Sequence, residues 1–355
     1  MTNKTFSLSD EQRETIRRRR LQTWIQTGEG FLIMGALIWW ALWATGFSFK
    51  FQLGFWLVYP AISVLSWLFS AKLALYMSKA TPADATVVTA AGTPVQDIVD
   101  RLFPLTGLSV KPPFYVSEDD RPNAFATGPF PAWAAICVTR GILTRDVGMT
   151  DQEIEGVLAH ELGHVKNGDV AIKSTIAIMS SIFFQIFDQV VNTWIKAQTW
   201  IQKAIEKGTG RSAPRILPPI AGQALSFVIF QLAGQLTRLI QLFVVRSRES
   251  GADAIGAEFM GDPCALARGL QKLALWVERN RPTGREASRL LAMRPMLIID
   301  PLYDGLTPEK PTSTLWQRIV AAWNYLHLDH PPIPARVHEL EVMAGHACPL
   351  TPPAN

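Results

Sequence analysis

The chain has 355 residues, of which 48% are hydrophobic and only 18% charged. Soluble enzymes usually carry about a quarter charged residues, so this balance favours a membrane protein. The formal net charge of +4 is small for this length and does not indicate nucleic-acid binding. The three cysteines, Cys137, Cys264 and Cys348, are far apart and lack CxxC spacing. They predict neither a disulfide framework nor a cysteine metal site, and they fit a reducing compartment.

The first predicted elements form a transmembrane hairpin at residues 30–79. Residues 1–29 are polar and include the cluster Arg17 to Arg20. The stretches 30–49 and 51–71 contain no charged residue. Each has about the 20 residues that a helix needs to cross a bilayer. A cleaved signal peptide is the alternative, but the first run is too long and has no clear cleavage site. Because basic residues favour the cytoplasmic side, the N-terminal segment and whatever follows the hairpin should be cytoplasmic.

Residues 80–170 are expected to form the first part of a domain outside the membrane, which continues at residues 246–355. Residues 95–105 have the pattern of an amphipathic helix, which Pro104 should end early. The β-branched and aromatic residues at 114–116 and 134–139 predict strands. The second strand could pair with an extended peptide. This part of the chain should therefore combine helices with a small sheet.

The most informative motif is H-E-x-x-H at residues 160–164. Thr150 and Glu153 form a capping box, so the motif should lie on a helix. His160 and His164 are four residues apart and should project from one face of that helix, where both imidazoles can bind a single metal ion. The same pattern can arise by chance in a buried helix. The helix start signal favours a zinc site.

Residues 171–245 are predicted to form a second membrane hairpin. The stretches 174–187 and 216–237 are uncharged. The alternative is long amphipathic helices of a soluble core, because prolines and glutamines interrupt the second stretch and the linker is basic. Such helices would be unusually apolar. The apolar runs favour insertion into the membrane, with shallow or tilted embedding as a variant.

A third metal ligand is expected in the second part of the domain, residues 246–355. Catalytic zinc sites use three protein ligands and a water, and two histidines leave one ligand to be found. Glu249 and Asp253 are four residues apart on a predicted helix. One can bind zinc while the other accepts the second ring N–H of a histidine ligand. A solvated charged face is the alternative, which the neighbouring H-E-x-x-H helix disfavours.

The chemistry that such a site supports is peptide hydrolysis. Zinc lowers the pKa of a bound water to about 7. Glu161 would take the proton of that water and deliver it to the leaving amine. The oxyanion needs a further donor, for which His330 and Arg336 are the candidates.

Four short motifs occur along nearly the whole chain. They are Asn123-Ala124-Phe125-Ala126-Thr127-Gly128, His160-Glu161-Leu162-Gly163-His164 with the flank Val165-Lys166-Asn167-Gly168-Asp169, Arg248-Glu249-x-x-Ala252-Asp253, and His330-Pro331-Pro332. In this order they resemble the motifs of HtpX-type integral-membrane zinc metallopeptidases, which are related to the CAAX prenyl endopeptidases. The resemblance includes two apolar spans before the zinc-helix motif and two after it.

The resemblance implies a role for individual residues. The implied roles are one zinc ion bound by His160, His164 and Glu249, with Glu161 as base, Asp253 behind a histidine ligand, Asn123 at the substrate backbone and His330 near the oxyanion. Arg336 is a further candidate for substrate binding. The chain departs from the family pattern at Ser250-Gly251, where an aromatic residue is usual, and at Leu328-Asp329, where a Ser/Thr-type lead is usual.

The sequence thus predicts a mainly α fold with a small β-sheet, in which a zincin-type (gluzincin) catalytic domain is fused to transmembrane helices. The expected function is that of a zinc endopeptidase of the inner or plasma membrane, with a cytoplasmic catalytic domain that cleaves misfolded or damaged membrane proteins. Its partners would be the bilayer and membrane-protein or peptide substrates. The alternatives are a prenyl-peptide (CAAX-type) endopeptidase and a non-catalytic scaffold stabilised by zinc. A structural zinc site has four protein ligands, which disfavours the scaffold.

Overall fold

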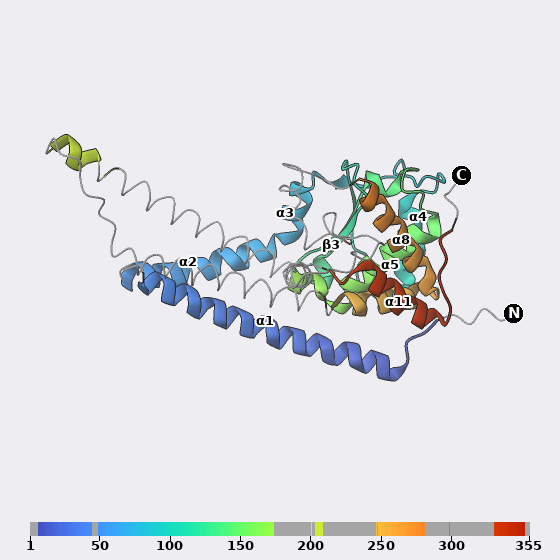
Figure 1. Cartoon of the computed structure of the whole chain (residues 1–355), viewed down its shortest axis with the longest axis horizontal. Coiled ribbons are helices and arrows are strands. Elements are labelled where there is room, and N and C mark those ends of the chain that lie inside the picture. The colour runs from blue at the N-terminus through green and yellow to red at the C-terminus, as the bar shows by residue number, and fades with distance from the viewer. Residues whose placement is uncertain are drawn as a thin grey trace, which may run out of the picture. The chain divides into compact units, whose positions relative to one another are not determined.

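The computed structural model divides the chain into two units. The described residues are 6–44, 49–173, 200, 203–208, 246, 248–280, 298 and 330–351. The first unit comprises residues 1–27, 67–175 and 241–355, and the second comprises 28–66 and 176–240. The first unit contains the sheet and the H-E-x-x-H helix (Figure 1).

Helices make up most of the first unit, as the sequence predicts. They are the start of α1 (Asp10–Ala44), α3 (Ser70–Met77), α4 (Val95–Thr106), α5 (Asp151–Asn167), a helical segment at 248–260, α8 (Pro263–Arg279) and α11 (Ile333–Ala344), with 3-10 turns η1 (Pro131–Trp133) and η2 (Arg140–Leu143). The expectation that Pro104 ends α4 early was wrong, since the helix continues to Thr106 and closes at Gly107 with a φ of 59°. A proline in the last turn removes only one terminal hydrogen bond, and the left-handed glycine ends the helix.

The sheet has four short strands. They are β1 (Thr81–Pro82), β2 (Phe114–Ser117), β3 (Ala124–Thr127) and β4 (Ala135–Thr139), in the order β1-β2-β4-β3. β2 and β4 are parallel, and the other two pairs are antiparallel. Both predicted strands are confirmed. The expectation that the second, β4, could pair with a peptide was wrong, because β2 and β3 occupy its two edges.

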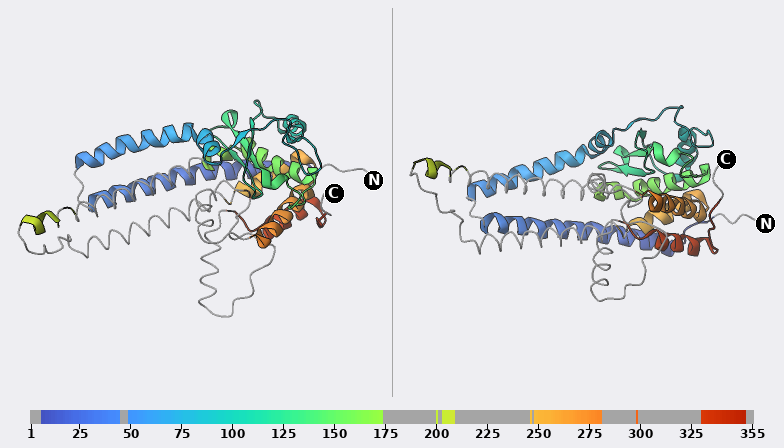
Figure 2. Two further views of the ribbon diagram at one scale, coloured as in Figure 1. Left: turned by 90° about the horizontal axis from the view of Figure 1, so that it is seen from above. Right: turned by 45° about the horizontal axis from the view of Figure 1, so that its top comes forward.

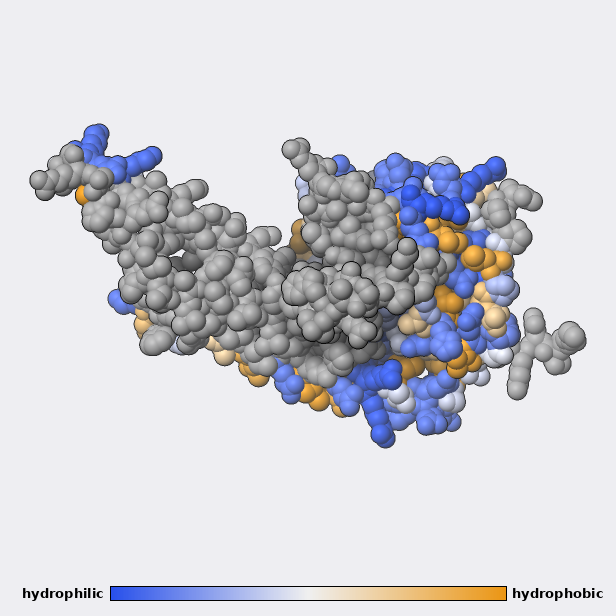
Figure 3. Space-filling view, viewed as in Figure 1, coloured by the Kyte–Doolittle hydropathy of each residue, from blue (hydrophilic) through white to orange (hydrophobic). Residues whose placement is uncertain are grey.

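α5 is the central helix of the hydrophobic core. It contacts α4, α8 and β3, and α8 in turn packs against α11. Figures 1 and 2 show α8 and α11 side by side. On the visible face of this unit, hydrophilic and hydrophobic residues are interspersed (Figure 3). The H-E-x-x-H motif therefore lies inside the hydrophobic core.

Cys264 and Cys348 form a disulfide that joins the start of α8 to the chain after α11. The expectation of no disulfide was wrong. The two residues are 84 positions apart, so their spacing gives no sign that α8 and α11 pack together. Cys137 stays a free, buried thiol on β4, and burial raises its pKa to about 12.

The second unit is described in part, by the end of α1, most of α2 (Phe49–Leu68) and the segment 203–208. The rings of Trp39 and Phe49 meet edge to face, with centroids 6.3 Å apart. Within the described ranges, no helix combines the length and the apolar composition needed to cross a membrane. The second hairpin predicted at 171–245 lies almost entirely outside those ranges.

Removing the disulfide should destabilise the first unit. A cross-link that closes a loop of this length stabilises a fold by up to about 4–5 kcal/mol in the chain-entropy account. Cys264→Ser and Cys348→Ser, singly and together, should therefore lower the thermal unfolding midpoint of the detergent-purified protein by similar amounts. Reductant should lower the wild-type midpoint to that of the double variant and leave the double variant unchanged. A double variant as stable as the wild type would contradict the pairing.

Candidate metal centre

α5 carries both predicted histidine ligands. Its first turn contains the predicted capping box, in which the Thr150 hydroxyl accepts from the Glu153 N–H and the Glu153 carboxylate accepts from the Thr150 N–H. The helix ends at Gly168, whose φ of 73° is left-handed. His160 and His164 are 1% and 2% exposed, and their ring centroids are 4.5 Å apart. Both imidazoles therefore face the same place inside the protein, as their spacing predicts.

The helical segment 248–260 crosses α5 closely enough to bring Glu249 to the two histidines. A Cβ added at Gly163 would lie 2.8 Å from a carbonyl oxygen of that segment. A Cβ added at Gly256 would lie 2.8 Å from a backbone nitrogen of α5. Any larger side chain at either position would push the two helices apart. Close backbone contact thus places a carboxylate from a distant part of the chain beside the motif.

His160, His164 and Glu249 each place one ligand atom within 4.8 Å of the others. Glu249 is fully buried, with Oε1 3.3 Å from His164 Nε2 and Oε2 3.6 Å from His160 Nε2. No described residue donates a hydrogen bond to Glu249 Oε2. The Lys173 ammonium lies 3.0 Å from His164 Nε2 and 2.6 Å from Glu249 Oε1, so these atoms accommodate a positive charge. Two imidazole nitrogens and a carboxylate oxygen fit a catalytic metal ion of the zinc type.

A carboxylate orients His160 from behind. Asp253 Oδ1 lies 2.8 Å from His160 Nδ1, and the Arg336 guanidinium donates to both oxygens of Asp253, at 2.9 and 2.6 Å. Burial alone would raise the pKa of Asp253, but Arg336 and His160 lower it to about 2. Asp253 is therefore a carboxylate that accepts the second ring N–H, which leaves Nε2 of His160 to face the centre.

The second histidine has a matching arrangement. Asp169 Oδ2 lies 2.9 Å from His164 Nδ1, Arg248 donates to Asp169, and Asn167 Nδ2 donates to it at 3.1 Å. Sequence reasoning did not give Asp169 or Arg248 a role. The sequence offered a clue to both residues, because Asp169 lies five residues after His164 and Arg248 directly precedes Glu249.

Burial and neighbouring charges set the ionisation of these groups. Burial and the adjacent His164 ring lower the pKa of His160. For His164, burial and the Lys173 ammonium lower the pKa, but the neighbouring carboxylates outweigh them and raise it to about 8. Burial raises the pKa of Glu249, yet the surrounding cationic groups, Lys173 first, hold it well below its usual value. The third predicted ligand is therefore ionised.

Glu161 directly follows the predicted ligand His160. It lies on α5 and is 3% exposed. Among the described residues, no hydrogen bond or ion pair engages its carboxylate. The carboxylate is thus available to move a proton, which is the role predicted for it.

The remaining predicted residues differ in where they lie. His330 reaches the centre, with Nδ1 3.2 Å from Glu249 Oε2, and neither ring nitrogen hydrogen-bonds to a described residue. Asn123 Oδ1 accepts from the Ile298 N–H at 3.0 Å, and Arg336 Nη1 donates to the Ile298 carbonyl at 3.1 Å. Both side chains thus hydrogen-bond to the backbone of Ile298. Their roles in substrate binding stay predictions.

Replacing either supporting carboxylate should weaken metal binding. Asp253→Asn and Asp169→Asn each remove an acceptor that orients a ligand histidine, so each should lower metal affinity about 10–100-fold. Competition with a chromophoric chelator measures this. Asp146→Asn, at an exposed residue just before α5, is the matched control and should leave the affinity unchanged. If both test variants bound the metal as tightly as the wild type, the role of Asp253 and Asp169 in orienting the ligand histidines would be contradicted.

Metal affinity should depend on pH through His164. The metal must displace the proton that this imidazole holds, so affinity should fall about tenfold per pH unit below the pKa and level off above it. That pKa is about 8. Asp169→Asn removes one group that raises the pKa, so its break should move to lower pH. The same chelator competition, repeated across pH, measures both breaks, and a profile that stays flat through the wild-type pKa would contradict the assignment.

Comparison with known proteins places this site in a family. Residues 90–344 match the model of peptidase family M48. The protease HtpX homolog of Kineococcus radiotolerans is 33% identical over 286 residues, which cover 81% of this chain and 84% of that protein. The protease HtpX homolog of Caldanaerobacter subterraneus subsp. tengcongensis is 26% identical, over 96% of this chain and 99% of its own.

One solved structure shows a weaker likeness. The crystal structure of S. mikatae Ste24p aligns with a TM-score of 0.42 and 16% identity, over 91% of this chain and 66% of that chain. The assignment rests on the sequence matches alone. The chain belongs to peptidase family M48 and is a metallopeptidase of the HtpX type.

Proposed function

We propose that this metallopeptidase is a membrane-embedded zinc endopeptidase that hydrolyses peptide bonds in misfolded or damaged membrane proteins. The observation that carries the proposal is the buried meeting of His160, His164 and Glu249. Glu161 follows His160 on the same helix, and no described residue engages its carboxylate. Three protein ligands leave a coordination place for water, as catalytic zinc sites require. Family membership favours this reading over a zinc-stabilised scaffold.

The residues of the chain divide the chemistry among them. A zinc ion held by the three ligands would supply a Lewis acid that acidifies water and polarises the scissile carbonyl. Glu161 would accept the proton of the attacking water and return it to the amine nitrogen as the C–N bond breaks. Asp253 and Asp169 keep both histidines in the ligating tautomer. His330, whose Nδ1 lies 3.2 Å from Glu249 Oε2, is a donor at the centre that could stabilise the oxyanion.

The membrane placement rests on the sequence. The uncharged stretches 30–49 and 51–71 have the length of membrane spans, and the basic cluster before them favours the cytoplasmic side. A cytoplasmic domain would meet a reducing environment, in which a disulfide is uncommon. The redox state of Cys264 and Cys348 in intact cells therefore reports on the orientation.

Replacing the proposed base should abolish cleavage while the metal stays bound. Glu161→Gln keeps the size of the side chain and removes its ability to take a proton, so peptide hydrolysis should fall at least about 100-fold. Zinc content by elemental analysis should stay at one ion per chain in both proteins, as a three-ligand site predicts. Cleavage of an unfolded membrane protein by the detergent-purified enzyme is the activity to measure.

The matched control is Glu155→Gln, which changes an acid on the same helix that pairs with Arg101 at 3.6 Å. It should cut at the wild-type rate. Equal cutting by Glu161→Gln would show that another group is the base. A prenylated peptide, supplied in parallel, separates the two enzyme readings: cutting of that peptide and not of the membrane protein would replace the proposed substrate class.

A further inference from the structure

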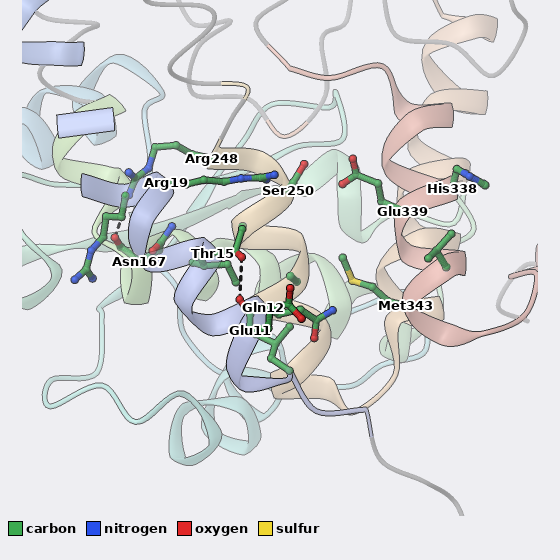
Figure 4. A pocket seen from close by; sticks show the side chains of 16 residues that line it. Glu11, Gln12, Thr15, Arg19, Asn167, Arg248, Ser250, His338, Glu339 and Met343 are labelled. Atoms are coloured by element: carbon green, nitrogen blue, oxygen red, sulfur yellow. Dashed lines mark hydrogen bonds between the residues drawn. The ribbon is translucent and has the colours of Figure 1, made fainter. Parts of the chain in front are cut away.

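A pocket lies in the first unit between the start of α1, the helical segment 248–260 and α11 (Figure 4). Its volume is about 440 Å³, which lies within the range of about 300–1,000 Å³ typical of small-molecule sites. Leu8, Ile16, Ala254 and Met343 give it an apolar wall. The pocket is distinct from the metal centre, because Ser250 and Gly251 line it while Glu249 and Asp253 face the histidines.

Basic side chains gather at one end of the pocket. Figure 4 shows Arg19 from α1 reaching toward Ser250, beside Arg248. Arg20 lines the pocket too. The two acidic lining residues, Glu11 and Glu339, come from the start of α1 and from α11. These two carboxylates and Asp169, which pairs with Arg248, oppose the three guanidinium groups, so the basic character of this end comes from Arg19 and Arg20.

Arg248 supplies the strongest sign of a ligand. It is only 3% exposed. Its Nε donates to Asp169, and its Nη2 donates to the Asn167 carbonyl. Its Nη1 has no hydrogen-bond partner in the part of the chain that the structure describes. Leaving a buried charged donor unsatisfied is costly, and the acceptors that suit a guanidinium best are anionic oxygens.

We propose that this pocket binds the phosphate headgroup of an anionic phospholipid. The phosphate oxygens would accept from Arg248 and from the arginines of α1, and the glycerol and first acyl carbons would lie on the apolar wall. A free phosphate ion would use only the basic end. The lipid is the better fit because the pocket continues beyond that end, and because α1 leads from its arginines into the uncharged stretch 30–49.

The choice of a membrane lipid rests on the membrane placement proposed above, but binding does not depend on proteolysis. The site has a direct link to the metal centre, since Arg248 holds Asp169 and Asp169 holds His164. A phosphate bound to Arg248 would fix the guanidinium that orients this ligand histidine. The binding experiment stands apart from the activity assay, so each proposal can fail alone.

The test is calorimetric titration of the full chain in non-ionic detergent. The probes are dihexanoylphosphatidylglycerol, dihexanoylphosphatidylcholine and inorganic phosphate. The anionic lipid should bind at least about tenfold more tightly than either of the others, because it alone combines charge-assisted hydrogen bonds with apolar contact. Inorganic phosphate that binds as tightly as the anionic lipid would overturn the lipid assignment, and so would the absence of binding.

Variants on one helix separate a built site from general charge attraction. Arg19→Gln/Arg20→Gln should weaken binding of the anionic lipid at least about tenfold. Arg17→Gln/Arg18→Gln removes the same charge from the same helix at residues that do not line the pocket, and should leave affinity nearly unchanged. Equal losses in the two double variants would overturn the proposal. Arg248→Lys keeps the charge but loses the guanidinium fork, and should weaken binding as well.

Discussion

The metal centre depends on the close backbone contact between α5 and the helical segment 248–260. Gly163 and Gly256 lie where any Cβ would meet the backbone of the facing helix. Side chains of ordinary size keep helix axes about 8–10 Å apart. The short glutamate side chain would not reach two histidines across a wider gap. The position of the third ligand therefore depends on Gly163 and Gly256, which have no side chains of their own.

The same contact buries several charges, and the arrangement of their partners follows from that burial. An ion taken out of water is strongly unfavourable unless an opposite charge and hydrogen bonds compensate it. Asp253 is compensated by Arg336 and Asp169 by Arg248, one pair behind each histidine. Such pairs add little net stability over an apolar replacement, so their contribution lies in orientation. They hold each imidazole with its Nδ1 turned away from the centre.

Local features of the centre were predictable from sequence because they depend on neighbouring residues. The capping box at Thr150 and the i, i+4 histidines place the motif on a helix whatever the rest of the chain does. The strands β2 and β4 follow in the same way from β-branched and aromatic runs. Sheet order is not local, so the flanking of β4 on both edges could not be predicted.

The less predictable contacts join residues far apart in the sequence. Asn123 meets Ile298, Arg336 meets Asp253, and Cys264 meets Cys348 only because the chain returns to the same core. Asp169 is a different case. It lies close to His164 in the sequence, and the left-handed turn at Gly168 brings it back toward the helix end. A polar residue just after a helix-ending glycine was the available signal.

The disulfide gives the chain an unusual covalent path. It closes a loop of 84 positions that begins at α8, includes the whole stretch 281–329, and carries His330 and all of α11. Chain breaks inside that loop do not divide the molecule into two pieces. A cut between α8 and His330, made by the enzyme itself or by a neighbour, would leave both fragments joined at Cys264 and Cys348. The nicked protein would keep α11, with Arg336 on Asp253, and would separate into two bands only after reduction.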